Sequence, residues 1–274
     1  VSSVRPLAGN GWPKISIITP NYNYDQFLEM TIRSVLLQRY PNLEYIIIDD
    51  GSTDRSVDII RKYEPWLTFW KTGPNKGQTR VLNEGFRMAT GEIVNWLCSD
   101  DYLCQGALTA VAQYFQRDPL ADAVVGKGDI LHLKYGNKLW TFSPRAIDII
   151  PVTVPFAQPS CFYRRGVLDR ASPLDESYDY LMDLELWAYF KSKEVRWRVV
   201  EDTLSVAHAS HTNKTSVGKE KIIVLKQNPE LLAQALSKTS DLDSDGIPDI
   251  EEFLDGQEIS IHAFCDGETA VLFP

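Results

Sequence analysis

Short apolar runs alternate with stretches of helical periodicity over the first 118 residues. The runs are rich in β-branched and aromatic side chains, which predicts buried strands at residues 15–18, 45–48, 67–71 and 93–97. Between them, apolar positions recur three and four residues apart, which predicts helices around residues 28–36, 57–63, 82–89 and 108–115. This alternation favours an α/β fold with a mainly parallel sheet and helices on both faces.

The alternation ends after residue 118. Shorter strands are predicted at residues 123–127, 130–134, 139–142 and 161–163, and a strong helix is predicted at residues 180–193. A loose segment at 208–218 precedes two more helical stretches, and beyond residue 239 the composition shifts to Asp and Gly. We therefore expect four parts: an N-terminal extension at 1–13, two halves of one domain at 14–118 and 119–239, and an appended module at 240–274.

Composition narrows the class of protein. The 274 residues carry a formal net charge of −9, which argues against a nucleic-acid partner. No apolar run approaches the roughly 18 residues of a spanning helix, and residues 1–12 lack the apolar core of a signal peptide. We expect a soluble protein. The four cysteines show neither zinc-site nor disulfide-scaffold spacing, so buried reduced thiols are expected.

Two predicted strands end in paired carboxylates. The run at 93–97 leads to Asp100 and Asp101, and the run at 45–48 leads to Asp49 and Asp50. Paired acids repel each other, so they usually persist where a cation neutralises them, although an isolated pair is more often a solvated loop. In open α/β sheets ligands bind outside the carboxyl ends of the strands. The two acidic strand ends therefore predict one site, with a metal at Asp100 and Asp101.

Five motifs extend this pattern. In order along the chain they are Ile17-Ile18-Thr19-Pro20-Asn21-Tyr22-Asn23, Ile48-Asp49-Asp50-Gly51-Ser52-Thr53-Asp54, Asn75-Lys76-Gly77-Gln78 with Asn83, Ala89-Thr90-Gly91-Glu92, and Ser99-Asp100-Asp101. Their order and spacing resemble the GT-A glycosyltransferases of family 2, and the resemblance covers roughly residues 14–226. It implies a GT-A fold and inverting transfer of a sugar from a nucleotide diphosphate donor, with UDP favoured and Mn²⁺ or Mg²⁺ as cofactor.

The resemblance also implies roles for particular residues. Those expected to line the nucleoside pocket are Pro20, Tyr22 and Asp50; Asp100 is expected to meet the ribose, and Asp101 to bind the metal. There are two departures from the family pattern: Ser99 occupies the first place of the acidic triad, and Leu82 stands where many members carry an Arg. Arg80 and Lys76 are candidates to replace that Arg.

A diphosphate leaving group needs positive charge. A divalent metal supplies it as a Lewis acid. The Lys76 side chain and the main-chain N–H groups near Gly77 are further candidates, although the Asn75-Lys76-Gly77 turn is as easily read as a simple loop.

Inversion also needs a base on the opposite face of the sugar. Asp183 and Glu185, two positions apart on the predicted helix, point to nearly opposite sides. Asp183 shares its side with Trp187 and Phe190, and desolvation among apolar rings would raise its pKa toward that of a working base. Asp183 also occupies the place of the family's acid-rich catalytic motif, so it is the expected base. The alternative is an acid that merely stabilises the N-terminus of a helix.

A second metal-site candidate is His211, in a His-Thr-Asn-Lys-Thr segment similar to one the family carries after the catalytic helix. In the family such a His approaches the metal and diphosphate. The Arg that precedes this segment in the family is replaced by Ala209, and His208 competes with His211 for the role.

The acceptor is expected to be a glycan or a lipid-linked molecule, and the location cytoplasmic, with peripheral association at the inner membrane face as an option. Sugar, nucleotide base, linkage and oligomeric state are not encoded in recognisable motifs. Two alternative functions stay open. One is a nucleotidyltransferase, which would need a Gly-rich basic signature near the first strand. The other is a non-catalytic protein that displays the C-terminal module to a calcium-dependent partner.

The C-terminal module contains a calcium-loop spacing. Acids stand at the first, third, fifth, ninth and twelfth places around Gly246, which predicts a Ca²⁺ site formed by Asp241, Asp243, Asp245, Asp249, Glu252 and the carbonyl of Ile247. The loop resembles thrombospondin type 3 or dockerin-like repeats, since Pro248 and the lack of an entering helix depart from an EF-hand. Such repeats are commonly extracellular, which conflicts with a cytoplasmic donor.

Overall fold

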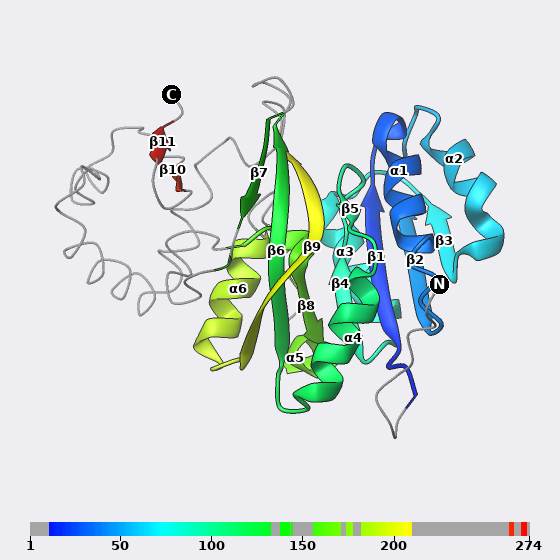
Figure 1. The fold of residues 1–274 in the computed structure, drawn as a ribbon. Helices are drawn as coiled ribbons and strands as arrows, with labels where there is room; N and C mark the ends of the chain where they lie inside the picture. Colours follow the sequence, from blue (N-terminus) through cyan, green and yellow to red (C-terminus); the bar gives the residue numbers. More distant parts are fainter. Residues whose placement is uncertain are drawn as a thin grey trace.

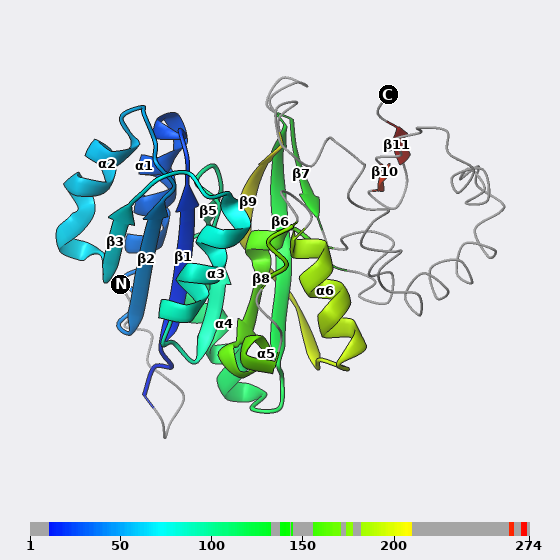
Figure 2. The same cartoon turned by 180° about the vertical axis from the view of Figure 1, so that it is seen from behind.

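The computed structural model describes residues 11–132, 138–142, 144, 156–170, 174–177, 182–209, 263–265 and 270–272. A nine-stranded mixed sheet runs through the molecule with helices on both faces (Figures 1 and 2). The strand order is β3-β2-β1-β4-β8-β6-β9-β5, with β7 paired to β6.

The first half follows the expected alternation. Its strands are parallel neighbours: β1 (Ile15–Asn21), β2 (Leu43–Asp49), β3 (Phe69–Thr72) and β4 (Ile93–Trp96). Its helices are α1 (Asp25–Leu36), α2 (Ser56–Tyr63) with the 3-10 turn η1 (Glu64–Trp66), α3 (Gln78–Met88) and α4 (Ala107–Arg117). The predicted strands and helices of this half are confirmed within a few residues.

The second half is largely antiparallel. It contains the strands β6 (Ala123–His132), β7 (Lys138–Phe142), β8 (Cys161–Arg164) and β9 (Trp197–Ala209). The short strand β5 (Tyr102–Leu103), from the first half of the chain, pairs antiparallel with β9. The helices are η4 (Gln158–Ser160), α5 (Arg165–Arg170) and α6 (Met182–Ser192). Only β6 and β9 pair in parallel here, so the expectation of a mainly parallel sheet holds for the first half alone.

The strands of this half differ from the prediction in two ways. The runs predicted as separate strands at 123–127 and 130–134 form the single strand β6 as far as the structure describes them, and β9 was not predicted at all. Two glycines of β6 allow close packing: a Cβ at Gly128 would lie 2.3 Å from the Ala157 Cβ, and one at Gly126 would lie 2.5 Å from the Leu204 Cγ. The start of the segment expected to be loose, at His208, is the end of β9.

Alternate strand residues enter two separate cores. In β1, Ile15 and Ile17 pack with α1, α2 and α4, whereas Ile18 packs with α3, α5 and α6 on the other face. Both faces of the central strands are thereby covered, which explains their continuous apolar runs. The helix α3 lies especially close to β1, because a Cβ at Gly85 would lie 2.4 Å from the Ile18 Cγ2.

Among the described helices, none combines the length and the apolar character needed to cross a bilayer. The strands β10 (Ala263–Cys265) and β11 (Ala270–Leu272) form a separate antiparallel pair.

Candidate active site

The two acidic strand ends lie on either side of β1, because β1 pairs with both β2 and β4. The backbone N–H of Asp50 donates to the Asn21 carbonyl at 2.8 Å, and the Ser99 hydroxyl donates to the Pro20 carbonyl at 2.8 Å. The end of β1 therefore connects both strand ends at one edge of the sheet, where ligands of open α/β sheets bind.

Asp49 has a structural environment. Its carboxylate is buried and accepts hydrogen bonds from Asn21 Nδ2 at 2.7 Å, from the Ser52 N–H at 3.0 Å and from the Thr72 hydroxyl at 2.6 Å. These donors hold the ends of β1, β2 and β3 together. At Asp49, protein hydrogen-bond donors therefore compensate the strand-end charge.

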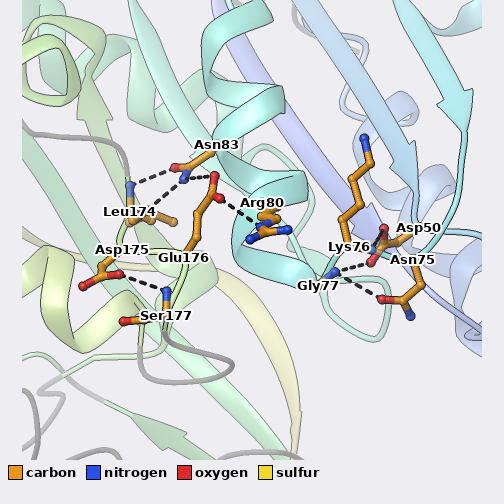
Figure 3. Close-up of polar contacts among 10 residues, drawn as sticks. All are labelled: Asp50, Asn75, Lys76, Gly77, Arg80, Asn83, Leu174, Asp175, Glu176 and Ser177. Atoms are coloured by element: carbon orange, nitrogen blue, oxygen red, sulfur yellow. Dashed lines mark hydrogen bonds and ion pairs between the residues drawn. The ribbon is translucent and has the colours of Figure 1, made fainter.

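Asp50 fixes the turn that leads into α3. Its two carboxylate oxygens accept the N–H groups of Lys76 at 2.7 Å and of Gly77 at 2.9 Å (Figure 3). Gly77 has a φ of 92°, a conformation that glycine adopts without strain. In the structure these two N–H groups donate to Asp50, and a role for them toward a phosphate stays a prediction. The exposed Lys76 side chain extends away from the Asp50 carboxylate (Figure 3).

The second strand end gathers three potential metal ligands. Ligand atoms of Cys98, Asp100 and Asp101 all lie within 4.8 Å of one another. Burial raises the pKa of Asp101 well above its ordinary value, and the neighbouring Asp100 charge adds to this. Burial also raises the pKa of Asp100. Two desolvated carboxylates this close together fit a hard divalent cation, which would relieve both burial and repulsion.

Residues from α1 and β9 hold this acidic cluster. The buried Thr31 hydroxyl lies 2.7 Å from the Ser99 carbonyl and 2.8 Å from that of Asp101. The His208 N–H donates to Asp101 Oδ1 at 3.1 Å, and His208 Nδ1 contacts the Asp100 carbonyl. The His208 ring packs against Phe27 at a centroid distance of 5.2 Å. His208 is therefore part of the site, whereas His211 lies outside the described residues.

Asp183 lies in the first turn of α6 and is half-buried. Burial raises its pKa, and the Leu184 N–H donates to its Oδ1 at 2.8 Å. Its negative charge contributes to the raised pKa of Cys98, the thiol whose pKa is also raised by burial and by Asp101 and Asp100. Burial raises the pKa of Glu185 as well, but the Oε2 of Glu185 accepts the Asp175 N–H at 3.4 Å, so its surroundings are different.

The other expected site residues take varied positions. Pro20 is buried near the end of β1, and Tyr22 follows that strand with 44% of its surface exposed. Leu82 is fully buried in the core, and Arg80 forms an ion pair with Glu176 at 2.9 Å. Arg80 is therefore committed to another partner. The calcium-loop residues 241–252 lie outside the described part of the chain.

Three residues near the cluster were not singled out from the sequence. Tyr24 faces the cluster, since burial and the charges of Asp100, Cys98 and Asp101 raise its pKa to about 12. Gln78 Nε2 lies 3.5 Å from Cys98 Sγ. Cys98 directly precedes the acidic triad and Gln78 ends the Asn75-Lys76-Gly77-Gln78 motif, which are signals that would have found them; nothing in the sequence indicates Tyr24.

Residues 16–171 match the model of the family described as "Glycosyl transferase family 2". The chain belongs to this family. An uncharacterised glycosyltransferase of Nostoc sp. is 35% identical over 179 residues, which cover 59% of this chain and 54% of the relative. The poly(ribitol-phosphate) β-N-acetylglucosaminyltransferase TarP of Staphylococcus aureus is 36% identical over 119 residues, 42% of this chain and 36% of TarP. The chain thus spans about half the length, or less, of these curated relatives.

Solved structures share the fold. The crystal structure of S. aureus TarS 1–349 in complex with UDP-GlcNAc has a TM-score of 0.64 at 22% identity, over 81% of this chain and 66% of the other. The mannosyltransferase PcManGT of Pyrobaculum calidifontis, in complex with GDP-Man and Mn²⁺, has a TM-score of 0.56 at 18% identity, over 93% of this chain and 71% of PcManGT. At these identities the likeness shows the fold alone.

Proposed function

We propose that the protein is an inverting, metal-dependent glycosyltransferase that moves a hexose-type sugar from a nucleotide diphosphate donor, with UDP favoured, to a glycan or lipid-linked acceptor. The observation that carries the proposal is the close pair formed by half-buried Asp100 and buried Asp101 at the carboxyl edge of the sheet. The charge of Asp183, on α6, acts on the neighbouring Cys98. Family membership and the UDP-GlcNAc bound to TarS support the donor class.

In this proposal the two strand ends share the donor. Asp50, together with Pro20 and Tyr22, meets the nucleoside, and Asp100 meets the ribose. Asp101 is the main carboxylate for Mn²⁺ or Mg²⁺, which would supply Lewis acidity to the diphosphate leaving group. The Mn²⁺ bound to PcManGT supports a divalent cation. His208 and His211 remain alternatives for a further contact, and Lys76 stays a candidate for the diphosphate.

Asp183 is proposed as the base that accepts the proton of the acceptor hydroxyl. Its half-buried position and raised pKa suit that task, because a base works best when its pKa approaches the working pH. Glu185, whose carboxylate contacts the Asp175 N–H, is proposed to have no direct part in proton transfer.

A thermal-shift screen of UDP, GDP, CDP and ADP, each with and without Mn²⁺, tests the donor site. Binding to the native state raises the melting temperature by an amount that grows with the logarithm of ligand concentration. We expect the largest shift with UDP and Mn²⁺ together. Release of UDP from UDP-sugars would then separate an enzyme from a pure binding protein, and release of pyrophosphate from nucleoside triphosphates would indicate a nucleotidyltransferase instead.

We also propose that residues 241–252 bind one Ca²⁺, on the spacing of their acids alone. This site would order the C-terminal module and be separate from catalysis. The acceptor, and a cytoplasmic or peripheral location at the inner membrane face, are proposals that rest on the family resemblance.

A further inference from the structure

The helix α3 touches both strand ends of the candidate active site. At its N-terminus, the Lys76 and Gly77 N–H groups donate to Asp50, and Gln78 reaches Cys98. Farther along, Gly85 permits close packing on β1. The helix is therefore fixed relative to the proposed donor site.

One turn into α3, Asn83 pairs with the backbone of a segment far away in sequence. Its Nδ2 donates to the Leu174 carbonyl at 2.8 Å, and its Oδ1 accepts the Leu174 N–H at 2.8 Å (Figure 3). Only 2% of Asn83 is exposed. A buried side chain that satisfies both polar groups of one residue fixes the position of that residue, because breaking the contact would strand buried polar atoms.

Glu176 adds a second contact to the same helix. Its Oε1 accepts Asn83 Nδ2 at 3.3 Å, and its Oε2 accepts Arg80 Nε at 2.9 Å (Figure 3). The Arg80 and Glu176 side chains are 56% and 42% exposed, so this ion pair adds less than the buried contact.

The segment held by α3 in turn contacts α6. The Asp175 N–H donates to Glu185 Oε2 at 3.4 Å, and the Ser177 N–H donates to Asp175 Oδ1 at 2.9 Å. Glu185 stands two positions after Asp183 in the first turn of the helix. A continuous series of contacts therefore runs from Asp50 through α3 and residues 174–177 to the turn that carries Asp183.

We propose that Asn83 and Glu176 are positioning residues that set the place of Asp183 relative to the bound donor. The inference rests on the proposed role of Asp183 as the base. A base must lie within hydrogen-bond reach of its proton, and a displacement of about 1 Å can cost on the order of 10²-fold in rate. Neither residue is among the groups proposed to bind the donor, so their loss should affect turnover rather than donor affinity.

The variants are Asn83→Leu, which removes the buried contact, and Glu176→Gln, which changes a side chain that is 42% exposed and so leaves the core intact. The matched control is Glu84→Gln. Glu84 lies on the same helix as Asn83 and forms an ion pair with Lys71 of β3, with side-chain exposures of 29% and 35%. Its carboxylate therefore pairs with the sheet and not with the described residues 174–177. UDP affinity with Mn²⁺ is measured by calorimetry, and kcat is measured as UDP release from UDP-GlcNAc.

We expect Glu176→Gln to lower kcat by about 3- to 10-fold and Asn83→Leu by more than about 10-fold, with UDP affinity within about twofold of wild type. Glu84→Gln should leave both unchanged. If UDP affinity falls in parallel with kcat, or if Glu84→Gln is equally damaging, the residues merely stabilise α3 and the inference is overturned.

Amide hydrogen exchange gives a readout that does not need activity. Asn83→Leu should speed exchange at the Leu174 amide and in the first turn of α6, residues 182–187, while Glu84→Gln leaves both unchanged. Unaltered exchange at residues 182–187 in both Asn83→Leu and Glu176→Gln would refute the positioning role, whatever the activity. The proposed function has a separate test in the wild-type protein. If the wild type neither binds UDP nor releases it from UDP-GlcNAc, while the variants still show the expected exchange pattern, the proposed function is refuted and the structural coupling is not.

Discussion

Asp101 is the residue with the least favourable electrostatic position in the described part of the site. It is 6% exposed, and its pKa is raised well above the ordinary value by burial and by the charge of Asp100. A carboxyl with a raised pKa in the folded state destabilises the fold once the pH exceeds its unfolded value. The residue therefore weakens the metal-free protein at neutral pH.

We predict that Asp101→Asn weakens binding of UDP with Mn²⁺ by more than the roughly 10- to 100-fold typical of outer-shell partners. The same change should leave the melting temperature of the ligand-free protein at pH 7 unchanged or higher, because it removes the repulsion. Calorimetry and thermal unfolding measure the two effects. Asp58→Asn, an exposed acid on α2, is the charge-matched control. Unchanged affinity in Asp101→Asn would remove Asp101 from the site.

For Asp183 we predict that replacement by Asn lowers turnover by at least about 10²-fold, with donor affinity retained. Glu185→Gln should lower turnover only mildly, since the amide oxygen still accepts the Asp175 N–H.

Burial raises the pKa of Asp183 above its ordinary 3.8. A base works only when deprotonated, so wild-type kcat should fall on the acidic side at a pH above 3.8. Transfer assays across pH check this, and a stronger effect of Glu185→Gln would reverse the assignment.

At the scale of elements, β1 and β2 are joined by a buried acid unrelated to the site. Glu44 accepts hydrogen bonds from the Ser16 hydroxyl, from the Thr90 N–H and hydroxyl, and from Lys14, at distances from 2.5 to 2.7 Å. Burial alone would raise its pKa, but these donors together lower it from 4.5 to about 2. A lowered carboxyl pKa contributes stability above pH 4.5 that is lost as the pH falls toward 2.

We predict that Glu44→Gln lowers the free energy of unfolding at pH 7 by at most roughly 3 kcal/mol, the equivalent of that pKa difference. The gap to wild type should close as the pH falls from 4.5 to about 2. Urea unfolding at several pH values measures it. Glu29→Gln, which breaks exposed contacts to Lys62 and Tyr63, should cost much less. A gap independent of pH would mean that packing, not charge, explains the loss.

The sequence predicts some elements better than others for physical reasons. Strands β1, β2 and β4 are covered on both faces and read as apolar runs. Strand β9 was not predicted because exposed residues such as Val199, Glu201 and Asp202 interrupt the regular alternation of apolar and polar positions that identifies a strand. Asp50 and Asp101 were located by the rule for strand ends. Tyr24 is affected by the cluster through tertiary packing, which has no local signature in the sequence.

At the scale of the whole molecule, the sheet joins two halves of different character. The parallel half brings two strand ends together beside β1, and the antiparallel half brings His208 on β9 and Asp183 on α6 toward them. The candidate site is therefore formed only when both halves are folded. Contacts that cross between the halves, such as that of Asn83 with Leu174, hold them together next to the site.

The last prediction concerns the module at residues 240–274. Because its acids repel one another without a cation, Ca²⁺ should order the loop at 241–252 and protect it from proteases. Removal of Ca²⁺ by EGTA should increase cleavage after Ser240, while Mn²⁺, resupplied in excess, still supports UDP binding at the separate donor site. The double variant Asp243→Asn/Asp245→Asn should reproduce the effect of EGTA. If the thrombospondin-like resemblance holds, half of the protection should be reached at a Ca²⁺ concentration of roughly 10⁻⁴–10⁻³ M, the range of extracellular modules. Cleavage after Ser240 that is equal with and without Ca²⁺ would show that the acidic spacing forms no calcium site.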